Sequence, residues 1–434
     1  MRRCRPLAHS PSILFVNRVF PPDKGATGRC AFDLAQRMAS AGWRVTVVAD
    51  GDGPSAAPPG VTVVRTGAGP MDSGAGEHGS RRGAATMVRD YLDALRRLTS
   101  RAMRLPRHDV VVTMTDPPLM ARVGPMLAAW HGAAAVHWCH DLYPALLPVL
   151  GLRIPDPLYR LVEWSVAGAL RRHDAVVAIG RCMARQLGAL GVPAERIVLL
   201  PNWAEPGIRP VAREDNRFRA ELGLGERFTI AYSGNLGLAH PMGGVLDAAA
   251  ELARTDPDLA FLVIGEGRGR PALETAAASR GLRNLRVLPL QPVGRLSESL
   301  SAADLHLASM DPRAEGLLVP CKVAGALAAG RPCLFLGPAG SEAAALVDGC
   351  GRVLDPADGA GLAAAVRGYA RDPVRCAEEG RRALSASVRW GADAAARRFT
   401  ALAESLLERA ARPVTTPAVA TPLVRVTGRR LPHA

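Results

Sequence analysis

Short runs of consecutive apolar residues alternate along the chain with segments in which apolar residues recur every three or four positions. The first two runs, 13–16 and 45–48, are typical of buried strands, and a Gly/Pro loop and an amphipathic helix lie between them. This order predicts a βαβ unit. Further apolar runs in the first half of the chain predict strands at 61–65, 109–114, 133–138, 174–180 and 196–202.

The same pattern restarts after the linker-like segment AEPGIRPVAREDN. It predicts a second set of strands at 228–237, 258–267, 285–290, 304–310 and 332–336. The repetition predicts an α/β protein with two doubly wound domains. Ligands of open α/β sheets bind beyond the carboxyl ends of the strands, so we expect the substrate in a cleft between the two domains.

The domain limits follow from this division. We expect an N-terminal Rossmann-like domain over 12–204 and a C-terminal one over 205–390. The segment 391–412 predicts an amphipathic helix that packs back near the N-terminal domain, with an apolar face made of Phe399, Leu402, Leu406 and Leu407. The Pro/Thr-rich remainder, 413–434, predicts a disordered tail, and the latter half of the Gly/Pro/Ala-rich excursion at 51–85 predicts a mobile loop.

Composition narrows the class of protein. The chain has 434 residues, of which 48% are hydrophobic and 22% charged, as expected of a globular protein with substantial cores. Its net charge of +14 invites a polyanion partner, but the basic residues are spread along the chain and aromatics are only 4%, which makes nucleic acid a weak alternative. The eight cysteines form no metal-binding spacing and read as reduced thiols. The Arg-rich start lacks the apolar core of a signal peptide, so we expect a cytoplasmic protein.

The segment EGLLVPCKVAGALAAGRPCLF, 315–335, carries the clearest candidate chemistry. A loop opens a small-residue helix that ends at Gly330 and Pro332, and a buried strand follows. The N-terminus of such a helix favours phosphate, because it offers free backbone N–H groups and a partial positive charge. Lys322 lies at this entrance, where a cation is misplaced unless an anion binds; the alternative is a solvated lysine in the first turn.

Five motifs together, HWCHDLYP, IVLLPNWAE, YSGNLG, VIGEG and VPCKVAGALAAGRP, resemble those of retaining glycosyltransferases of family 4 (group 1), which have the GT-B fold. The resemblance extends from residue 12 to about residue 412 and is strongest to the branch that includes colanic-acid and O-antigen transferases. It implies transfer of a sugar from a nucleotide diphosphate donor, with UDP favoured and GDP as the second choice, to a hydroxyl of a glycan or lipid-linked acceptor. No metal or cofactor is required in this family.

The resemblance also implies which residues hold the donor in the C-terminal domain. Gly234 and Asn235 are expected near the diphosphate, and Gly265 and Glu266 near the nucleotide base. The backbone around the helix entrance is expected to face the diphosphate, and a carboxylate follows the next strand; these positions are Val319, Pro320, Cys321, Lys322 and Glu342. For each of them, an ordinary turn glycine or a solvated side chain is the alternative.

Two positions depart from the family pattern. The glutamates that many relatives carry eight residues apart are replaced here by Leu317 and Gly325, although Glu315 lies two residues from the first position. The Arg/Lys pair that clamps the diphosphate in relatives is replaced by Leu238-Ala239-His240. We therefore expect Lys322, helped by His240 or Arg268, to supply the positive charge.

In the N-terminal domain the resemblance implies an acceptor site and a donor-facing loop. Lys24 and Gly25 precede the first helix and are expected to approach the donor phosphates, and Thr115 and Asp116 follow a strand into the cleft. His140 and Asp141 follow the next strand and are the expected catalytic residues, because an imidazole or carboxylate there could orient the acceptor hydroxyl and accept its proton. The alternative is that Asp141 caps a turn and His140 packs in the core.

The segment 87–107 combines an apolar helical stripe with six arginines. This pattern is typical of a helix that contacts an anionic membrane, here the inner face of the cytoplasmic membrane, and equally of an ordinary outer helix of an α/β domain. Two other functions stay open from the sequence. One is a nucleotide-sugar epimerase or hydrolase with the same fold, and the other is a catalytically impaired binding protein.

Overall fold

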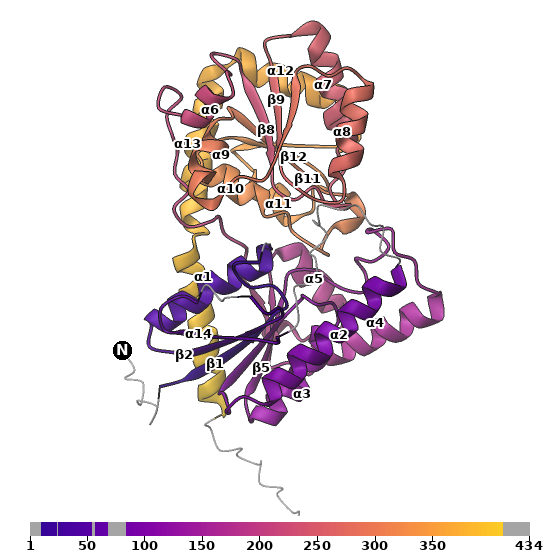
Figure 1. Ribbon diagram of the computed structural model, residues 1–434, viewed down its shortest axis with the longest axis vertical. Helices are drawn as coiled ribbons and strands as arrows, with labels where there is room; N and C mark the ends of the chain where they lie inside the picture. Colours follow the sequence, from indigo (N-terminus) through magenta and orange to yellow (C-terminus); the bar gives the residue numbers. More distant parts are fainter. Residues whose placement is uncertain (1–9, 24, 54–56, 68–83, 411–434) are drawn as a thin grey trace, which may run out of the picture.

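The computed structural model describes residues 10–23, 25–53, 57–67 and 84–410, and it consists of two α/β domains stacked along the long axis of the molecule (Figure 1). Lys24, the latter half of the 51–85 excursion and the segment 413–434 lie outside the described residues. Each domain is built on one parallel sheet. The prediction of two doubly wound, Rossmann-like domains of the GT-B type is confirmed.

The N-terminal sheet has seven strands in the order β3-β2-β1-β4-β5-β6-β7, all paired in parallel. Its strands are β1 (Ser12–Val16), β2 (Arg44–Ala49), β3 (Val61–Arg65), β4 (Val110–Met114), β5 (Ala134–Cys139), β6 (Ala175–Ala178) and β7 (Ile197–Leu199). The helices that connect them are α1 (Ala26–Ser40), α2 (Ala84–Met103), α3 (Met120–His131), α4 (Asp156–Leu170) and α5 (Arg181–Ala189).

The C-terminal sheet has six parallel strands in the order β10-β9-β8-β11-β12-β13. Its strands are β8 (Thr229–Ser233), β9 (Ala260–Ile264), β10 (Leu285–Leu288), β11 (Leu305–Ser309), β12 (Cys333–Leu336) and β13 (Gly351–Leu354). The helices are α6 (Arg217–Glu221), α7 (Gly243–Thr255), α8 (Arg270–Ser279), α9 (Leu296–Ser301), α10 (Lys322–Ala328), α11 (Glu342–Leu346), α12 (Gly359–Arg371), α13 (Pro373–Arg389) and α14 (Ala392–Ala410).

Each predicted strand has a counterpart in the structure, and six of the twelve are shorter by one to four residues at the carboxyl end. The predicted runs include the first loop residues, such as Gly234 and Gly265, which continue the apolar pattern but leave the sheet. Strand β13 was missed. It is a short edge strand whose middle residues, Arg352 and Val353, are exposed, so its sequence lacks an apolar run.

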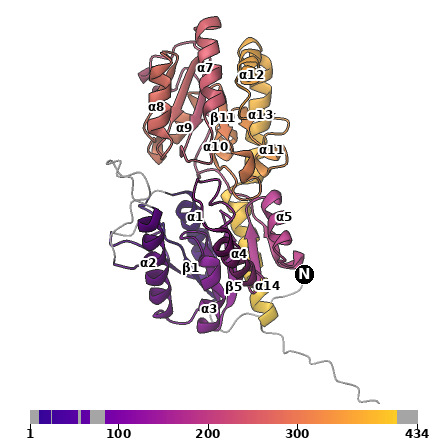
Figure 2. The same ribbon diagram turned by 90° about the vertical axis from the view of Figure 1, so that its right-hand side faces the viewer.

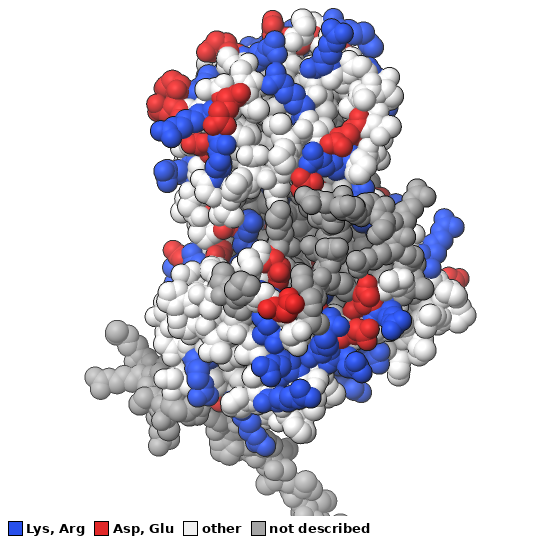
Figure 3. Space-filling view, in the orientation of Figure 1, with Lys and Arg blue, Asp and Glu red and all other residues white. Residues whose placement is uncertain are grey.

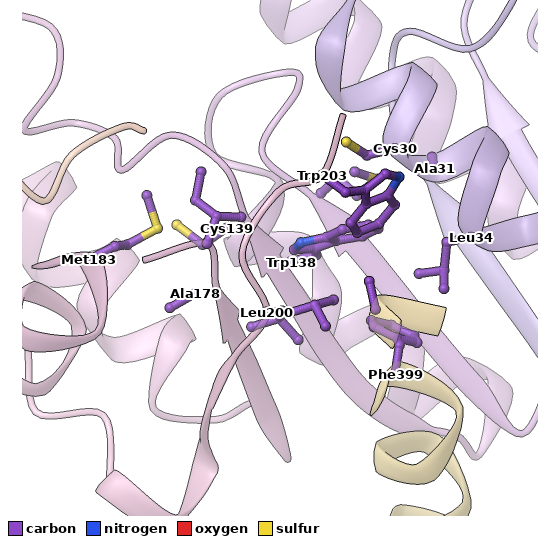
Figure 4. Packing of buried hydrophobic residues seen from close by; sticks show 14 of the residues in the cluster. Cys30, Ala31, Leu34, Trp138, Cys139, Ala178, Met183, Leu200, Trp203 and Phe399 are labelled. Carbon is purple, nitrogen blue, oxygen red and sulfur yellow. The ribbon is translucent and has the colours of Figure 1, made fainter. Parts of the chain in front are cut away.

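The last helix connects the two domains. Helix α13 lies beside the C-terminal sheet, whereas α14 runs down to the N-terminal domain and packs against α1 and β5 (Figure 1). The ring of Phe399 of α14 contacts those of Phe15 and Trp138 in tilted arrangements, with ring centroids 6.0 and 5.7 Å apart, and Trp203 stacks on Trp138 at 5.9 Å (Figure 4). The core of the first domain therefore includes residues from the end of the chain.

Candidate functional site

The loops at the carboxyl ends of the two sheets meet between the domains. A backbone hydrogen bond crosses from Leu142, which follows β5, to the carbonyl of Leu317, which precedes α10, at 2.8 Å. A second set of contacts joins α5 to the loop after β12, and both views place α5 next to α11 across the boundary (Figures 1 and 2). The candidate site residues of both domains therefore lie along one interdomain seam.

In the C-terminal domain, two glycines allow the ends of β8 and β9 and the side chain of Lys322 to approach one another closely. Gly234 has a φ of 135°, and its N–H bonds to the carbonyl of Ile264 at 2.8 Å. A Cβ on Gly265 would lie 2.0 Å from the Gly234 carbonyl oxygen, and a Cβ on Gly234 would lie 3.1 Å from Cε of Lys322. The ends of β8 and β9 and the side chain of Lys322 can thus pack together only because both positions lack a side chain.

Lys322 is the first residue of α10, and its side chain is half-buried across Gly234. Its Nζ lies 5.2 Å from the centre of the Tyr232 ring. Burial lowers the pKa of Lys322 from 10.5 to about 8. Within the described residues no carboxylate pairs with this ammonium, so a half-buried cation faces the strand-end loops without a protein anion.

His240 and Arg268 differ in what they can add to this charge. The Nδ1–H of His240 donates to the Ser309 carbonyl at 2.6 Å. Burial, followed by the nearby Lys322, lowers the pKa of His240 to about 3, which favours the neutral ring; a positive charge from His240 at the diphosphate stays a prediction. Burial raises the pKa of Tyr91 of α2, and the charge of Arg268 partly opposes this rise; the exposed Arg268 guanidinium therefore lies toward the N-terminal domain.

The other predicted donor positions hold the loops in shape. Asn235 accepts a hydrogen bond from Tyr232 through its carbonyl at 3.0 Å. The Glu266 carboxylate pairs with Arg270 at 2.6 Å, and its carbonyl accepts from Leu236 at 2.7 Å. The segment containing Val319, Pro320 and Cys321 forms the turn that leads into α10, with Cys321 exposed at its entrance.

Two of the three predicted donor carboxylates, Glu342 and Glu315, point at α5 of the N-terminal domain. Glu342 is buried and accepts from the backbone N–H of Arg181 at 2.6 Å and from its Nε and Nη2 at 3.2 Å each. Both oxygens therefore accept hydrogen bonds from Arg181, and a donor contact by Glu342 stays a prediction. Glu315 pairs with Arg185 at 3.5 Å rather than standing in for the missing family glutamate.

On the acceptor side, Thr115 organises the turn after β5. Its Oγ1 accepts from the backbone N–H of His140 at 2.7 Å and of Asp141 at 3.3 Å. The His140 ring is buried against Trp138, with centroids 4.9 Å apart, and burial lowers its pKa to about 3. The packing alternative therefore describes His140. Burial, followed by the charge of Asp116, raises the pKa of Asp141 to about 7, which suits a group that exchanges a proton at neutral pH.

Sequence reasoning missed two partners of this side of the seam. Arg18, in the loop after β1, binds Asp116 through Nε and Nη2 at 2.7 and 2.9 Å and lies over the Tyr91 ring at 5.7 Å. No local signal separates Arg18 from the other arginines of this Arg-rich chain. The loop that precedes Gly25 is held by Arg65, whose guanidinium binds Asp23 and the carbonyls of Phe20 and Pro21.

Among the described helices, none is both long and apolar enough to cross a bilayer. In the same part of the chain, no three His, Cys, Asp or Glu side chains group closely enough to hold a metal ion.

Comparison with known proteins identifies relatives of both domains. Residues 25–203 match the family model of the glycosyl transferase 4-like domain, and residues 227–372 match that of the glycosyl transferases group 1. WcaI of Escherichia coli K12, assigned as a colanic acid biosynthesis glycosyl transferase, is 31% identical over 50% of this chain. WbjE of Pseudomonas aeruginosa, described as a glycosyltransferase, is 29% identical over 62% of it. The matches span 54% and 66% of the length of these two relatives.

Solved structures share the fold across nearly the whole chain. HepE of Anabaena, in complex with UDP and glucose, superposes with a TM-score of 0.69 at 16% identity over 91% of this chain and 100% of that chain. Sucrose-phosphate synthase from Thermosynechococcus elongatus superposes with a TM-score of 0.73, also at 16% identity, over 92% of this chain and 100% of that chain.

Proposed function

Because the chain belongs to the group 1 glycosyltransferases that carry a family 4-like N-terminal domain, we propose that it transfers a sugar from a nucleotide diphosphate donor to an acceptor hydroxyl with retention. The observation that carries the proposal is the ammonium of the half-buried Lys322, which lies beside Gly234 at the entrance of α10 and has no carboxylate partner among the described residues. A diphosphate at this point would neutralise the ammonium and accept hydrogen bonds from the backbone. UDP is favoured as the nucleotide because HepE was solved with UDP and with UDP-glucose; GDP is the second choice.

The residues of the seam divide the chemistry between them. Lys322, with Arg268 reaching from the loop after β9, stabilises the negative charge that grows on the diphosphate as the bond between the sugar and the phosphate oxygen breaks. The acceptor oxygen attacks from the same face, and its proton passes to the departing diphosphate. Asp141, whose backbone N–H is bonded to Thr115, accepts a hydrogen bond from a second hydroxyl of the acceptor and so holds the attacking hydroxyl in line, and the proton of the attacking hydroxyl is left to pass to the diphosphate. No metal or cofactor takes part in this scheme.

Thermal stabilisation by a panel of UDP, GDP, ADP and dTDP, each with its sugar conjugates, tests the donor site. A ligand that binds only the folded protein raises its unfolding midpoint. We expect one nucleotide family to give a selective rise. The absence of any rise in a folded sample would refute the donor site and leave a binding protein that does not recognise nucleotides. If the protein converts the nucleotide sugar in the absence of an acceptor, its activity is hydrolysis or epimerisation and not transfer.

We further propose that the acceptor is lipid-linked. In this proposal, α2, α3 and α4 of the N-terminal domain contact the anionic inner face of the cytoplasmic membrane. The inner side of α2 packs on the sheet through Ala94, Leu98 and Ala102, as an ordinary outer helix does. Its outer side and the two following helices nevertheless expose large apolar side chains, which are Val88, Leu92, Met126, Trp130, Leu158, Leu161 and Trp164.

Charge and shape of this face fit a membrane surface. An apolar groove of about 500 Å³ runs between α2 and α3, and the arginines Arg96 and Arg104 flank it. Figure 3 shows basic side chains gathered over the lower half of the molecule, around α2. Exposed tryptophans beside arginines are typical of surfaces that enter the headgroup region of anionic bilayers.

Flotation with phosphatidylglycerol vesicles tests this contact, with phosphatidylcholine vesicles as the lipid control. We expect binding to the anionic vesicles, and a loss of at least fivefold in the variant with Trp130→Ser and Trp164→Ser. Trp390→Ser, in the turn between α13 and α14, is the matched control. Equal flotation of the double variant and the wild-type protein would remove this face from membrane binding.

A further inference from the structure

Helix α5 is seated between two loops of the C-terminal domain, although it belongs to the N-terminal sheet (Figures 1 and 2). Glycines make the approach possible on both sides of the contact. A Cβ on Gly180, just before α5, would lie 2.8 Å from Cβ of Glu342. Gly316 has a φ of 77°, and a Cβ there would lie 2.6 Å from Cγ of Gln186 and 2.9 Å from the Cys182 carbonyl oxygen. The seam therefore has no room for side chains at these positions.

One buried carboxylate lies at the centre of this contact. The side chain of Glu342 is fully buried, and all three of its hydrogen-bond donors belong to Arg181. The shortest of these bonds, 2.6 Å, comes from the backbone N–H at the first position of α5, where the helix dipole also favours a negative charge. A carboxylate without such partners is costly to bury, so Glu342 favours the arrangement in which α5 is in contact.

A second, weaker set of contacts supports the same approach. The Nη2 of Arg185, one turn further along α5, donates to the Gly340 carbonyl at 2.9 Å and lies 3.5 Å from Glu315. Both side chains of the Arg185–Glu315 pair are partly exposed, at 62% and 35%. Exposed pairs of this kind contribute little, so the closed state depends mainly on Glu342.

We propose that Glu342 is an interdomain latch: a positioning residue that holds the two domains in the closed arrangement through Arg181 and does not bind the donor. Closure brings Leu142 to the carbonyl of Leu317. Leu142 directly follows Asp141, and Leu317 lies five residues before Lys322. The latch thus sets the distance between the acceptor-side carboxylate and the donor-side ammonium.

The state of the latch can be measured without any substrate. The backbone N–H groups of Arg181 and Leu142 are both bonded across the seam, so their hydrogen exchange reports closure directly. In Glu342→Gln we expect both amides to exchange at least tenfold faster and the radius of gyration measured by X-ray scattering to increase. Glu315→Gln, on the same seam, is the matched control and should change neither readout.

Measurements of kcat and of the Kd for UDP distinguish a latch from a donor contact, and this test rests on the proposed function. We expect Glu342→Gln to lower kcat by 10- to 100-fold while the Kd for UDP changes by less than threefold, because Lys322 and Arg268, the two cations proposed to bind the diphosphate, both lie in the C-terminal domain. Arg181→Met should act in the same direction, and the double variant should be no worse than Glu342→Gln alone. If Glu342→Gln does not fold, Arg181→Met provides the same readouts, since it keeps the backbone N–H.

Two results would overturn the latch. One is slow exchange at Arg181 and Leu142 in a folded Glu342→Gln or Arg181→Met protein, because the seam would then close without the pair. The other is a loss of UDP affinity of tenfold or more with unchanged exchange, which would return Glu342 to the donor site. A protein that binds no nucleotide but shows the expected exchange would refute the proposed function and leave the latch intact.

Discussion

Replacing Lys322 with Met should raise the stability of the ligand-free protein and at the same time weaken donor binding. The variant keeps the aliphatic stem but removes the ammonium. A pKa of about 8 in place of the ordinary 10.5 corresponds to roughly 3 kcal/mol of folding free energy spent on keeping the buried group charged. The lost contact with the Tyr232 ring offsets about 1 kcal/mol of this, so we expect a gain of roughly 2 kcal/mol at pH 7.

The pH dependence of the free energy of unfolding tests independently whether the Lys322 ammonium destabilises the folded protein. The folded-state pKa of Lys322 lies below that of the unfolded chain, so the unfolded chain binds more protons between pH 8 and pH 10.5. The contribution of Lys322 to the free energy of unfolding therefore rises with pH across this window. Below pH 8 the folded protein bears the full cost of keeping the ammonium charged. Methionine does not titrate, so the gain in the free energy of unfolding from Lys322→Met should shrink as pH rises from 8 toward 10.

Donor affinity should move in the opposite direction. A hydrogen bond to a charged group contributes about 1.5–3 kcal/mol, so Lys322→Met should weaken UDP binding by roughly 10- to 150-fold. In the wild-type protein the affinity should fall by about tenfold for each pH unit above 8, because the ligand-free lysine loses its proton there. In Lys322→Met, which has no ammonium at this position, the affinity for UDP should not fall above pH 8 for this reason.

Urea unfolding and titration calorimetry with UDP, both between pH 6.5 and pH 9.5, measure the two effects. Lys322→Arg keeps the charge and should recover part of the affinity. Arg280→Met removes a cation that pairs with Asp247 on the surface, and it should change neither quantity by much. A Lys322→Met protein that binds UDP within threefold of the wild-type value would refute the reasoning, as would one that is less stable at pH 7.

Two further predictions concern the histidines and the turn after β5. Burial lowers the folded-state pKa of His140 to about 3 and of His173 and His306 to about 4, so the stability that these residues provide is present above pH 6.5 and is lost as pH falls. Each should cost roughly 2 kcal/mol between pH 7 and pH 5. Urea midpoints at these two pH values measure the sum over the buried histidines, including His108 and His240, whose pKa values burial lowers to about 4 and about 3, and an unchanged midpoint at pH 5 would contradict it. Thr115→Val removes the acceptor for the N–H groups of His140 and Asp141 and should cost about 1–3 kcal/mol in unfolding free energy and at least tenfold in kcat, whereas Thr115→Ser should keep most of both.

The arrangement of strands and the helix entrance at Lys322 could be predicted from local patterns. Parallel strands that are covered on both faces must be apolar along their length, so each central strand appears as an uninterrupted run. Helix α10 begins at Lys322, and Gly330, with a φ of 66°, follows its end, as the glycine and proline in the sequence indicated. The edge strand β13 carries no such pattern because solvent covers part of it.

What the charged residues do was decided by the tertiary structure. Glu342 and Asp141 each follow a strand, and nothing in the local sequence separates a carboxylate that binds another domain from one that stays available for proton exchange. That difference arises because α5 brings Arg181 to Glu342 across 161 positions, whereas burial and the like charge of Asp116 raise the pKa of Asp141. For His240, which the sequence offered as a cation, burial beside Lys322 favours the neutral ring. The sequence by itself determined the two sheets and the loops at their ends, because strand and helix patterns are local. Only the folded structure determined the charge and the partner of each side chain in those loops, because burial and ion pairing depend on residues brought together from distant parts of the chain.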